Sequence, residues 1–185
     1  MSSTTVIEAV KWAQLHCHPS VACPSVTHVS VVLQRHAGVS LRLSYRISGE
    51  QLAIRVPALS PATRRDELWK HTCAELFVIA LDDEPYCEFN FSPSQEWAAY
   101  EFSSYRRGMQ PANCAAPKLH VEQTAQLLSL DIDVELPKKW QAVRPWQLGL
   151  SLVLEDDTGR CSHWALRHDA DRPDFHQRDS MTLIL

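Results

Sequence analysis

The chain has 185 residues, of which 45% are hydrophobic and 22% are charged, which is ordinary for one domain with a sizeable buried core. Its formal charge of −4 at pH 7 offers no basic surface for nucleic acid. The first 20 residues do not read as an export signal, and no apolar run reaches the ~18 residues of a membrane-spanning helix. We therefore expect a single cytoplasmic domain over residues 1–185, without a nucleic-acid or membrane partner.

Cysteine and histidine spacing gives no sign of a metal or disulfide framework. The six cysteines form no C-x-x-C pair, so we expect free thiols in a reducing compartment. The cluster His16-Cys17-His18, followed by Cys23, matches no zinc pattern. We expect residues 1–24 to be irregular.

Apolar and polar residues alternate over several segments, which is typical of strands with one buried face. The clearest alternation lies at 39–47, 128–136 and 148–154. After the first of these, Ser48-Gly49-Glu50 favours a turn and residues 52–56 alternate again, so we expect a hairpin there.

Further extended segments fill the rest of the chain. Strands are expected at 72–81, 86–92, 96–102, 119–121, 162–166 and 181–185, with a short helical turn at 137–140 and one short helix in the polar tail. No segment keeps a helical period over three turns. Nine to eleven antiparallel strands predict an all-β fold, a β-sandwich of two sheets packed face to face.

The most informative stretch runs from Leu68 to Phe102. Within it, Glu88 and Asn90 alternate with Phe89 and Phe91. Successive side chains of a strand point to opposite faces, so the two polar residues share one face and the two aromatic residues share the other. This pattern indicates either a polar lined surface or the rim of a core that contains buried polar groups.

Five motifs carry a family resemblance: LWKHTCAELFV, YCEFNFSP, EWAAYEF, SHWAL and RPDFHQRDSMTLIL. Together they resemble the small bacterial DOMON-like proteins, which are grouped near type 9 carbohydrate-binding modules, and the resemblance extends from about Val26 to Leu185. It implies a jelly-roll-like β-sandwich, in agreement with the strand pattern. Relatives of this kind bind either sugars or haem.

The resemblance also implies a sugar site. Trp69 stands six residues before Glu75, a spacing similar to the aromatic and acidic pair of type 9 modules, and Trp164 resembles the second aromatic residue by position. A flat indole covers the apolar face of a sugar ring, while carboxylates and amides bind its hydroxyls. On this resemblance Glu88, Asn90 and Arg106 would complete the polar ring of the site.

A purely structural interpretation stays open beside it. Tryptophan is most often a core residue, and Glu75 could pair over the sheet with Arg64 or Arg65.

Haem binding is the second functional hypothesis, since DOMON relatives use methionine with histidine or lysine as axial ligands. The candidate ligands in this sequence are Met109, Lys70, His71 and His163.

An enzyme is the third hypothesis, because acid, base and cation crowd the C-terminal segment at His168, Asp174, His176, Arg178 and Asp179. The alternative for this cluster is structural: Asp174 would cap a short helix at Phe175, and Arg178 or Asp179 would pair with the sheet rim.

The sequence favours a non-catalytic binding module for a sugar or sugar derivative, with no cofactor and no metal. The acidic pairs Asp82-Asp83 and Asp156-Asp157 are expected to be hairpin tips rather than calcium ligands. An exposed sheet face would also allow a homodimer.

Overall fold

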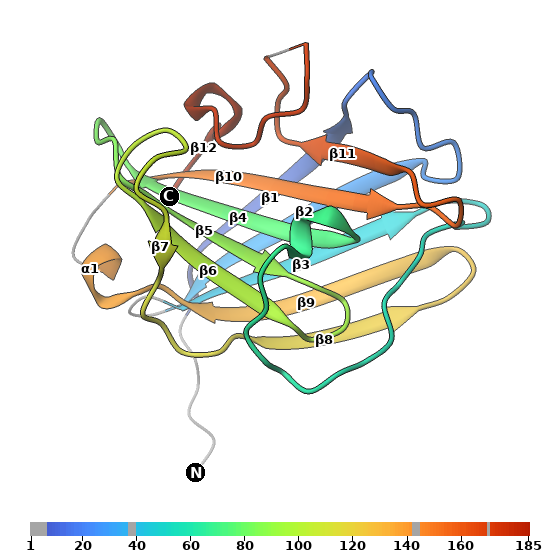
Figure 1. Ribbon diagram of the computed structural model, residues 1–185, viewed down its shortest axis with the longest axis horizontal. Helices are drawn as coiled ribbons and strands as arrows, with labels where there is room; N and C mark the ends of the chain where they lie inside the picture. The colour runs from blue at the N-terminus through green and yellow to red at the C-terminus, as the bar shows by residue number, and fades with distance from the viewer. Residues whose placement is uncertain (1–6, 37–39, 142–144, 170) are drawn as a thin grey trace.

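The computed structural model describes residues 7–36, 40–141, 145–169 and 171–185. The chain forms antiparallel strands in two facing layers, with β4, β5, β6 and β10 in front of β1, β2 and β3 in Figure 1. The all-β fold expected from the sequence is therefore confirmed.

The first layer contains five strands in the order β1-β2-β3-β9-β8. Their bounds are Ile7–Cys17, His28–His36, Ser40–Ser48, Leu127–Glu135 and Lys118–Gln123. Because β2 and β9 pair with the two edges of β3, the strongest alternating segment lies at the centre of this layer.

The second layer follows the order β7-β6-β5-β4-β10-β11, and β12 also pairs with β10. The bounds are Gln110–Pro111, Trp97–Phe102, Tyr86–Phe91, Cys73–Ala80, Trp146–Glu155, Cys161–Ala165 and Leu183–Ile184. The end of β1 pairs with β11, at His16 with Ala165 and Cys17 with Trp164. The two layers are thus one continuous sheet that curls over itself.

The core between the layers follows from the period of two. In β3 the side chains of Leu41, Leu43, Tyr45 and Ile47 are completely buried, while the residues between them reach solvent. Phe89 and Phe91 of β5 enter this core from the other layer and stack on each other. The alternation of β5 therefore sends Glu88 and Asn90 to the outer face of the second layer.

Two expectations from the sequence are wrong. Within residues 1–24, the segment Ile7–Cys17 is strand β1, and residues 1–6 lie outside the described part. β1 was hard to predict because Val10 and Trp12 are exposed on its outer face, which hides the alternation of Ala13 and Leu15.

Residues 52–56 also do not return as a hairpin strand beside β3. Both edges of β3 are already occupied, so this segment crosses elsewhere: the Leu52 amide donates to the Ala125 carbonyl and the Arg55 amide to the Glu155 carbonyl.

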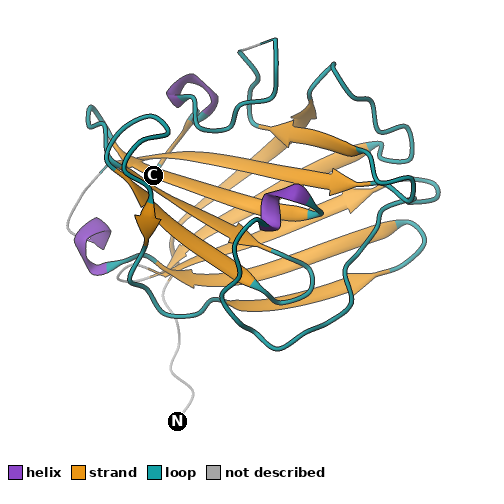
Figure 2. Cartoon of the chain, in the orientation of Figure 1, coloured by secondary structure: helices purple, strands orange, loops and turns teal. Residues whose placement is uncertain are grey.

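The helices are short and peripheral (Figure 2). They are a 3₁₀ turn η1 at Leu68–Lys70, helix α1 at Lys138–Gln141 and a second 3₁₀ turn η2 at Arg178–Ser180. In the described part of the chain, no helix has the length and apolar character needed to cross a membrane.

Candidate functional site

The outer face of the second layer carries a second apolar cluster, separate from the core between the layers. It includes Phe77, Tyr86, Tyr100 and Phe102 from strands β4, β5 and β6. Turn η1, the loop between β6 and β7, and the segment before η2 supply further side chains around this face, among them Leu68, Arg106 and Phe175. An outer sheet face that is covered only in part leaves room for a ligand.

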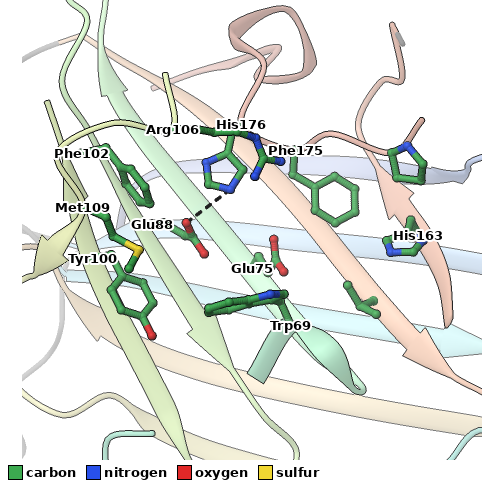
Figure 3. Close-up of a pocket in the computed structure, with 12 residues that line it drawn as sticks. Trp69, Glu75, Glu88, Tyr100, Phe102, Arg106, Met109, His163, Phe175 and His176 are labelled. Carbon is green, nitrogen blue, oxygen red and sulfur yellow. Dashed lines mark ion pairs between the residues drawn. The ribbon is translucent and has the colours of Figure 1, made fainter. Parts of the chain in front are cut away.

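A cavity of about 470 Å³ lies in this cover, within the usual range of small-molecule sites. In Figure 3, the carboxylates of Glu75 and Glu88 lie between the Trp69 indole and the His176 ring. The full lining is Trp69, Glu75, Glu88, Tyr100, Phe102, Arg106, Met109, Val153, His163, Pro173, Phe175 and His176.

Two carboxylates form the floor of the cavity. Glu75 of β4 lies opposite Asn90 of β5 in the ladder, and Glu88 lies two residues before Asn90 on the same face of β5. Both acids are almost fully buried, at 3% and 5% exposure. The Ser151 hydroxyl donates to Glu75 over 3.3 Å, and the Asn90 amide donates to Glu88 over 2.7 Å. Each acid is thus held by a neutral donor from the adjoining strand or the same strand.

Burial changes the protonation of both acids, because low polarity disfavours the charged form. Burial raises the pKa of Glu88 from 4.5 to about 7, against the opposing effects of the Asn90 hydrogen bond and the Arg106 charge. Burial and the charge of Glu88 raise the pKa of Glu75 well above its ordinary value. The pair therefore holds a proton more readily than exposed carboxylates do.

His176 lies beside Glu88 as a neutral imidazole. Burial, followed by the charge of Arg106, lowers the pKa of His176 to about 4. Its Nδ1 is 2.7 Å from the Tyr86 hydroxyl, which already accepts the Arg106 backbone N–H. Since the Tyr86 oxygen accepts from Arg106, its own proton is available for His176 Nδ1. This arrangement leaves Nε2–H directed at Glu88, 3.7 Å away.

A clasp joins two of the covering loops above the cavity. The Arg106 guanidinium donates to Asp174 over 2.8 Å, the Tyr105 hydroxyl donates to the same carboxylate, and Asp174 also accepts the His176 backbone N–H. Burial by itself would raise the pKa of Asp174, but the contacts with Tyr105 and Arg106 lower this pKa overall. The clasp thus fixes both Arg106 and His176 relative to the carboxylate floor.

Aromatic side chains form the walls. Trp69 is presented by the short turn η1, is 36% exposed, and meets Tyr100 edge to face at 6.1 Å between ring centres. Phe102 and Phe175 line the same space. An aromatic wall over a polar floor suits a ligand that has one apolar face and several hydrogen-bonding groups.

Four of the six residues proposed from the sequence, namely Trp69, Glu75, Glu88 and Arg106, line this one cavity. Asn90 lies beneath it, completely buried, and orients Glu88 through its hydrogen bond. The alternative pairing of Glu75 with Arg64 or Arg65 is not observed: Arg64 donates to the carbonyls of Ala99 and Ala112, and Arg65 pairs with Glu96.

The structure does not bring Trp164 to the cavity, so its pairing with Trp69 in one pocket is wrong. Trp164 is opposite Leu152 in the ladder between β10 and β11 and shares its face, which belongs to the core between the layers. Its indole N–H donates to the Ser162 hydroxyl. The neighbouring residue, His163, has the opposite orientation and lines the cavity instead.

The candidate residues of the haem and enzyme hypotheses lie only partly at the cavity. Of the haem candidates, Met109 and His163 line the cavity, whereas Lys70 pairs with Glu67 and His71 with Glu155.

Of the C-terminal cluster, only His176 lines the cavity. Asp174 belongs to the clasp, and Asp179 is exposed. Arg178 donates to Gln147 and to the Asp83 carbonyl, and His168 contacts the His16 carbonyl. The contacts of Arg178 tie the tail to the rim of the sheet, as the structural alternative expected. The expected helix cap is wrong: residues 175–176 form a turn, and the Asp174 carboxylate instead accepts from Arg106 and from the His176 backbone N–H.

Tyr100, Phe102 and Phe175 were not singled out from the sequence. Tyr100 and Phe102 are two residues apart in EWAAYEF, so alternation places them on one face, and this signal was available. Phe175 lies in an irregular segment, where no sequence period indicates its direction.

No protein-family model and no curated protein matches the chain. Among solved structures, the chain is similar to a proposed carbohydrate-binding protein from Bacteroides uniformis, with 14% identity, a TM-score of 0.62, and coverage of 94% of this chain and 84% of that one. This likeness shows a shared fold.

A family 9 carbohydrate-binding module from Caldicellulosiruptor kristjanssonii is also similar in two structures, with cellotriose and with glucose. Identities are 10% and 12%, and TM-scores are 0.47 and 0.49. Each match covers 85% of this chain, and 72% and 74% of the module respectively.

Proposed function

We propose that the protein binds a sugar or sugar derivative, without chemical change, in the cavity beside Trp69. The observation that carries this proposal is the convergence of an exposed indole with Glu75, Glu88 and Arg106 on one cavity of about 470 Å³. An indole can cover the C–H face of a pyranose, while carboxylates and a guanidinium hydrogen-bond its hydroxyls. The shared fold with a proposed carbohydrate-binding protein supports the same function.

Each group has a distinct part in this function. Trp69 and Tyr100 supply apolar contact area, and their edge-to-face packing limits the loss of side-chain freedom on binding. Glu75 and Glu88 are already oriented by Ser151 and Asn90, so a ligand meets acceptors in fixed positions. A site that is preorganised in this way spends little of its binding free energy on ordering side chains.

Isothermal titration with a panel of mono- and disaccharides tests the proposal. Trp69→Ala should weaken binding of the best sugar by about tenfold or more, because central tryptophans dominate binding energies. Trp12→Ala is the matched control: Trp12 is 61% exposed on β1, outside the residues that line the cavity, and its loss should leave the affinity unchanged. Indifference to every sugar, or equal affinity in Trp69→Ala, would contradict the proposal. The bound sugar should be recovered intact.

Haem binding is a second candidate, supported by Met109 and His163 in the same cavity. The fit is poorer, because the floor is formed by the acids Glu75 and Glu88, which offer no positive charge to the propionates of a haem. The absorbance spectrum of freshly purified protein separates the two candidates. A Soret band that is lost in His163→Ala would favour haem, and its absence after haem addition would leave the sugar proposal in place.

A further inference from the structure

The charge balance of the cavity floor suggests what kind of sugar it takes. Glu75 accepts from the Ser151 hydroxyl, and Glu88 accepts from the Asn90 amide, with neutral His176 at 3.7 Å. Within the described part of the chain, no lysine or arginine forms an ion pair with either acid. Two buried carboxylates therefore share a site without a cation of their own.

Arg106, the arginine in the lining, does not supply that cation directly. Its guanidinium is 2.8 Å from Asp174, so its charge is matched within the clasp. The two imidazoles in the lining supply no positive charge either, because burial lowers the pKa of both His163 and His176, the latter to about 4. At neutral pH the floor therefore either has a net negative charge, with both acids ionised, or keeps a proton on one of the two acids.

A ligand with an ammonium group removes this imbalance. A buried carboxylate is costly unless it is paired, and two neighbouring carboxylates cannot both ionise freely. An ammonium offers three N–H donors, enough to bridge both acids. The same cavity is lined by the aromatic residues Trp69, Tyr100, Phe102 and Phe175, and an aromatic ring whose face meets an ammonium attracts it more than it attracts an uncharged hydroxyl.

We propose that the cavity selects a cationic amino sugar, a hexosamine with a free amine, whose ammonium group lies between Glu75 and Glu88 while its ring covers Trp69. This inference rests on the proposed sugar-binding function and narrows it to one ligand class. A neutral sugar would leave at least one acid protonated or uncompensated, whereas the ammonium allows both acids to ionise.

The test compares D-glucosamine and D-galactosamine with their N-acetylated forms and with D-glucose and D-galactose, by titration calorimetry at pH 7. One free amino sugar should bind at least about tenfold more tightly than its acetylated and neutral counterparts, since hydrogen bonds to charged groups contribute that much. Titration in two buffers of different ionisation enthalpy should show net proton release to the buffer, because the acids ionise on binding.

Glu75→Gln and Glu88→Gln keep the side-chain shape and remove one charge each, and both should lose most of the preference for the free amine. Glu122→Gln, an exposed acid on β8, is the control and should retain it. Near-ultraviolet circular dichroism verifies that each variant is folded. Equal or tighter binding of glucose would overturn the amino-sugar inference and leave sugar binding intact. Binding of no sugar at all would overturn both.

Discussion

Replacing Glu88 by glutamine should make the protein more stable at neutral and alkaline pH, although it removes a residue of the proposed site. Glutamine has almost the same shape, and its side-chain carbonyl can still accept the 2.7 Å hydrogen bond from Asn90. What disappears is a carboxylate that is 5% exposed and has no cationic partner of its own among the described residues. The charge, rather than the packing, is therefore the quantity that the substitution changes.

The size of the effect follows from the pKa of Glu88, which burial raises from 4.5 to about 7. A folded-state pKa above the unfolded value means that the folded state holds the proton more tightly. The contribution of Glu88 to the free energy of unfolding is fully favourable below pH 4.5 and is lost as the pH rises through 7. The total loss is ~3 kcal/mol, at 1.36 kcal/mol per pKa unit. Glu75, whose pKa is also raised, acts in the same direction.

Urea unfolding of the wild type and Glu88→Gln at pH 5, 6, 7 and 8 measures this contribution. The stability advantage of the variant should grow with pH and level off above 7, at about 2.5 kcal/mol over its value at pH 5, because part of the total is already lost at pH 5. Glu155→Gln is the contrasting control: Glu155 is equally buried but lies 2.7 Å from both Arg55 and His71, so its loss should destabilise by about 1–2 kcal/mol at pH 8. A pH-independent difference between the wild type and Glu88→Gln would refute the reasoning.

Three further outcomes are expected. Trp164→Ala should lower stability by about 3–5 kcal/mol in urea unfolding, since Trp164 belongs to the core, and the folded variant should keep its sugar affinity. Asp174→Asn should break the clasp to Arg106 and speed amide hydrogen exchange at 103–109 and 173–177; the wild type should show the same loosening as pH falls below 3.8, because the pKa of Asp174 is lowered. Gly49→Ala should cost about 1–3 kcal/mol in the same unfolding assay, because the added Cβ would lie 1.9 Å from the Ser25 carbonyl oxygen.

The first layer was largely predictable because its central strands have one face in the core and one toward solvent. β3 alternates cleanly for this reason, and so does most of β9. β10 is buried on both faces, and its strand was indicated by leucines that alternate with the smaller residues Gly149 and Ser151. β1 escaped prediction because its outer face carries the exposed apolar residues Val10 and Trp12. The false hairpin at 52–56 had a suitable pattern, but the edge of β3 that it needed is taken by β9.

The candidate site was predictable only where alternation determines orientation. Glu88 and Asn90 were assigned correctly to one face of β5, opposite Phe89 and Phe91. Trp164 was assigned to the wrong face of β11. Both faces of this strand are covered, so the apolar character of Trp164 does not reveal which face it occupies. Side chains from the covering loops, such as Phe175, depend on long-range contacts that no local period encodes.

The most direct test of the sugar site uses the indole N–H signals of the six tryptophans in two-dimensional NMR. During titration with glucosamine, the Trp69 signal should shift and saturate, together with backbone amides of 103–109 and 173–176. The signals of buried Trp97, Trp146 and Trp164, and of Trp12 on the other layer, should stay in place. Saturation of any other indole with Trp69 unmoved, or no shift with any sugar, would contradict a ligand site in this cavity.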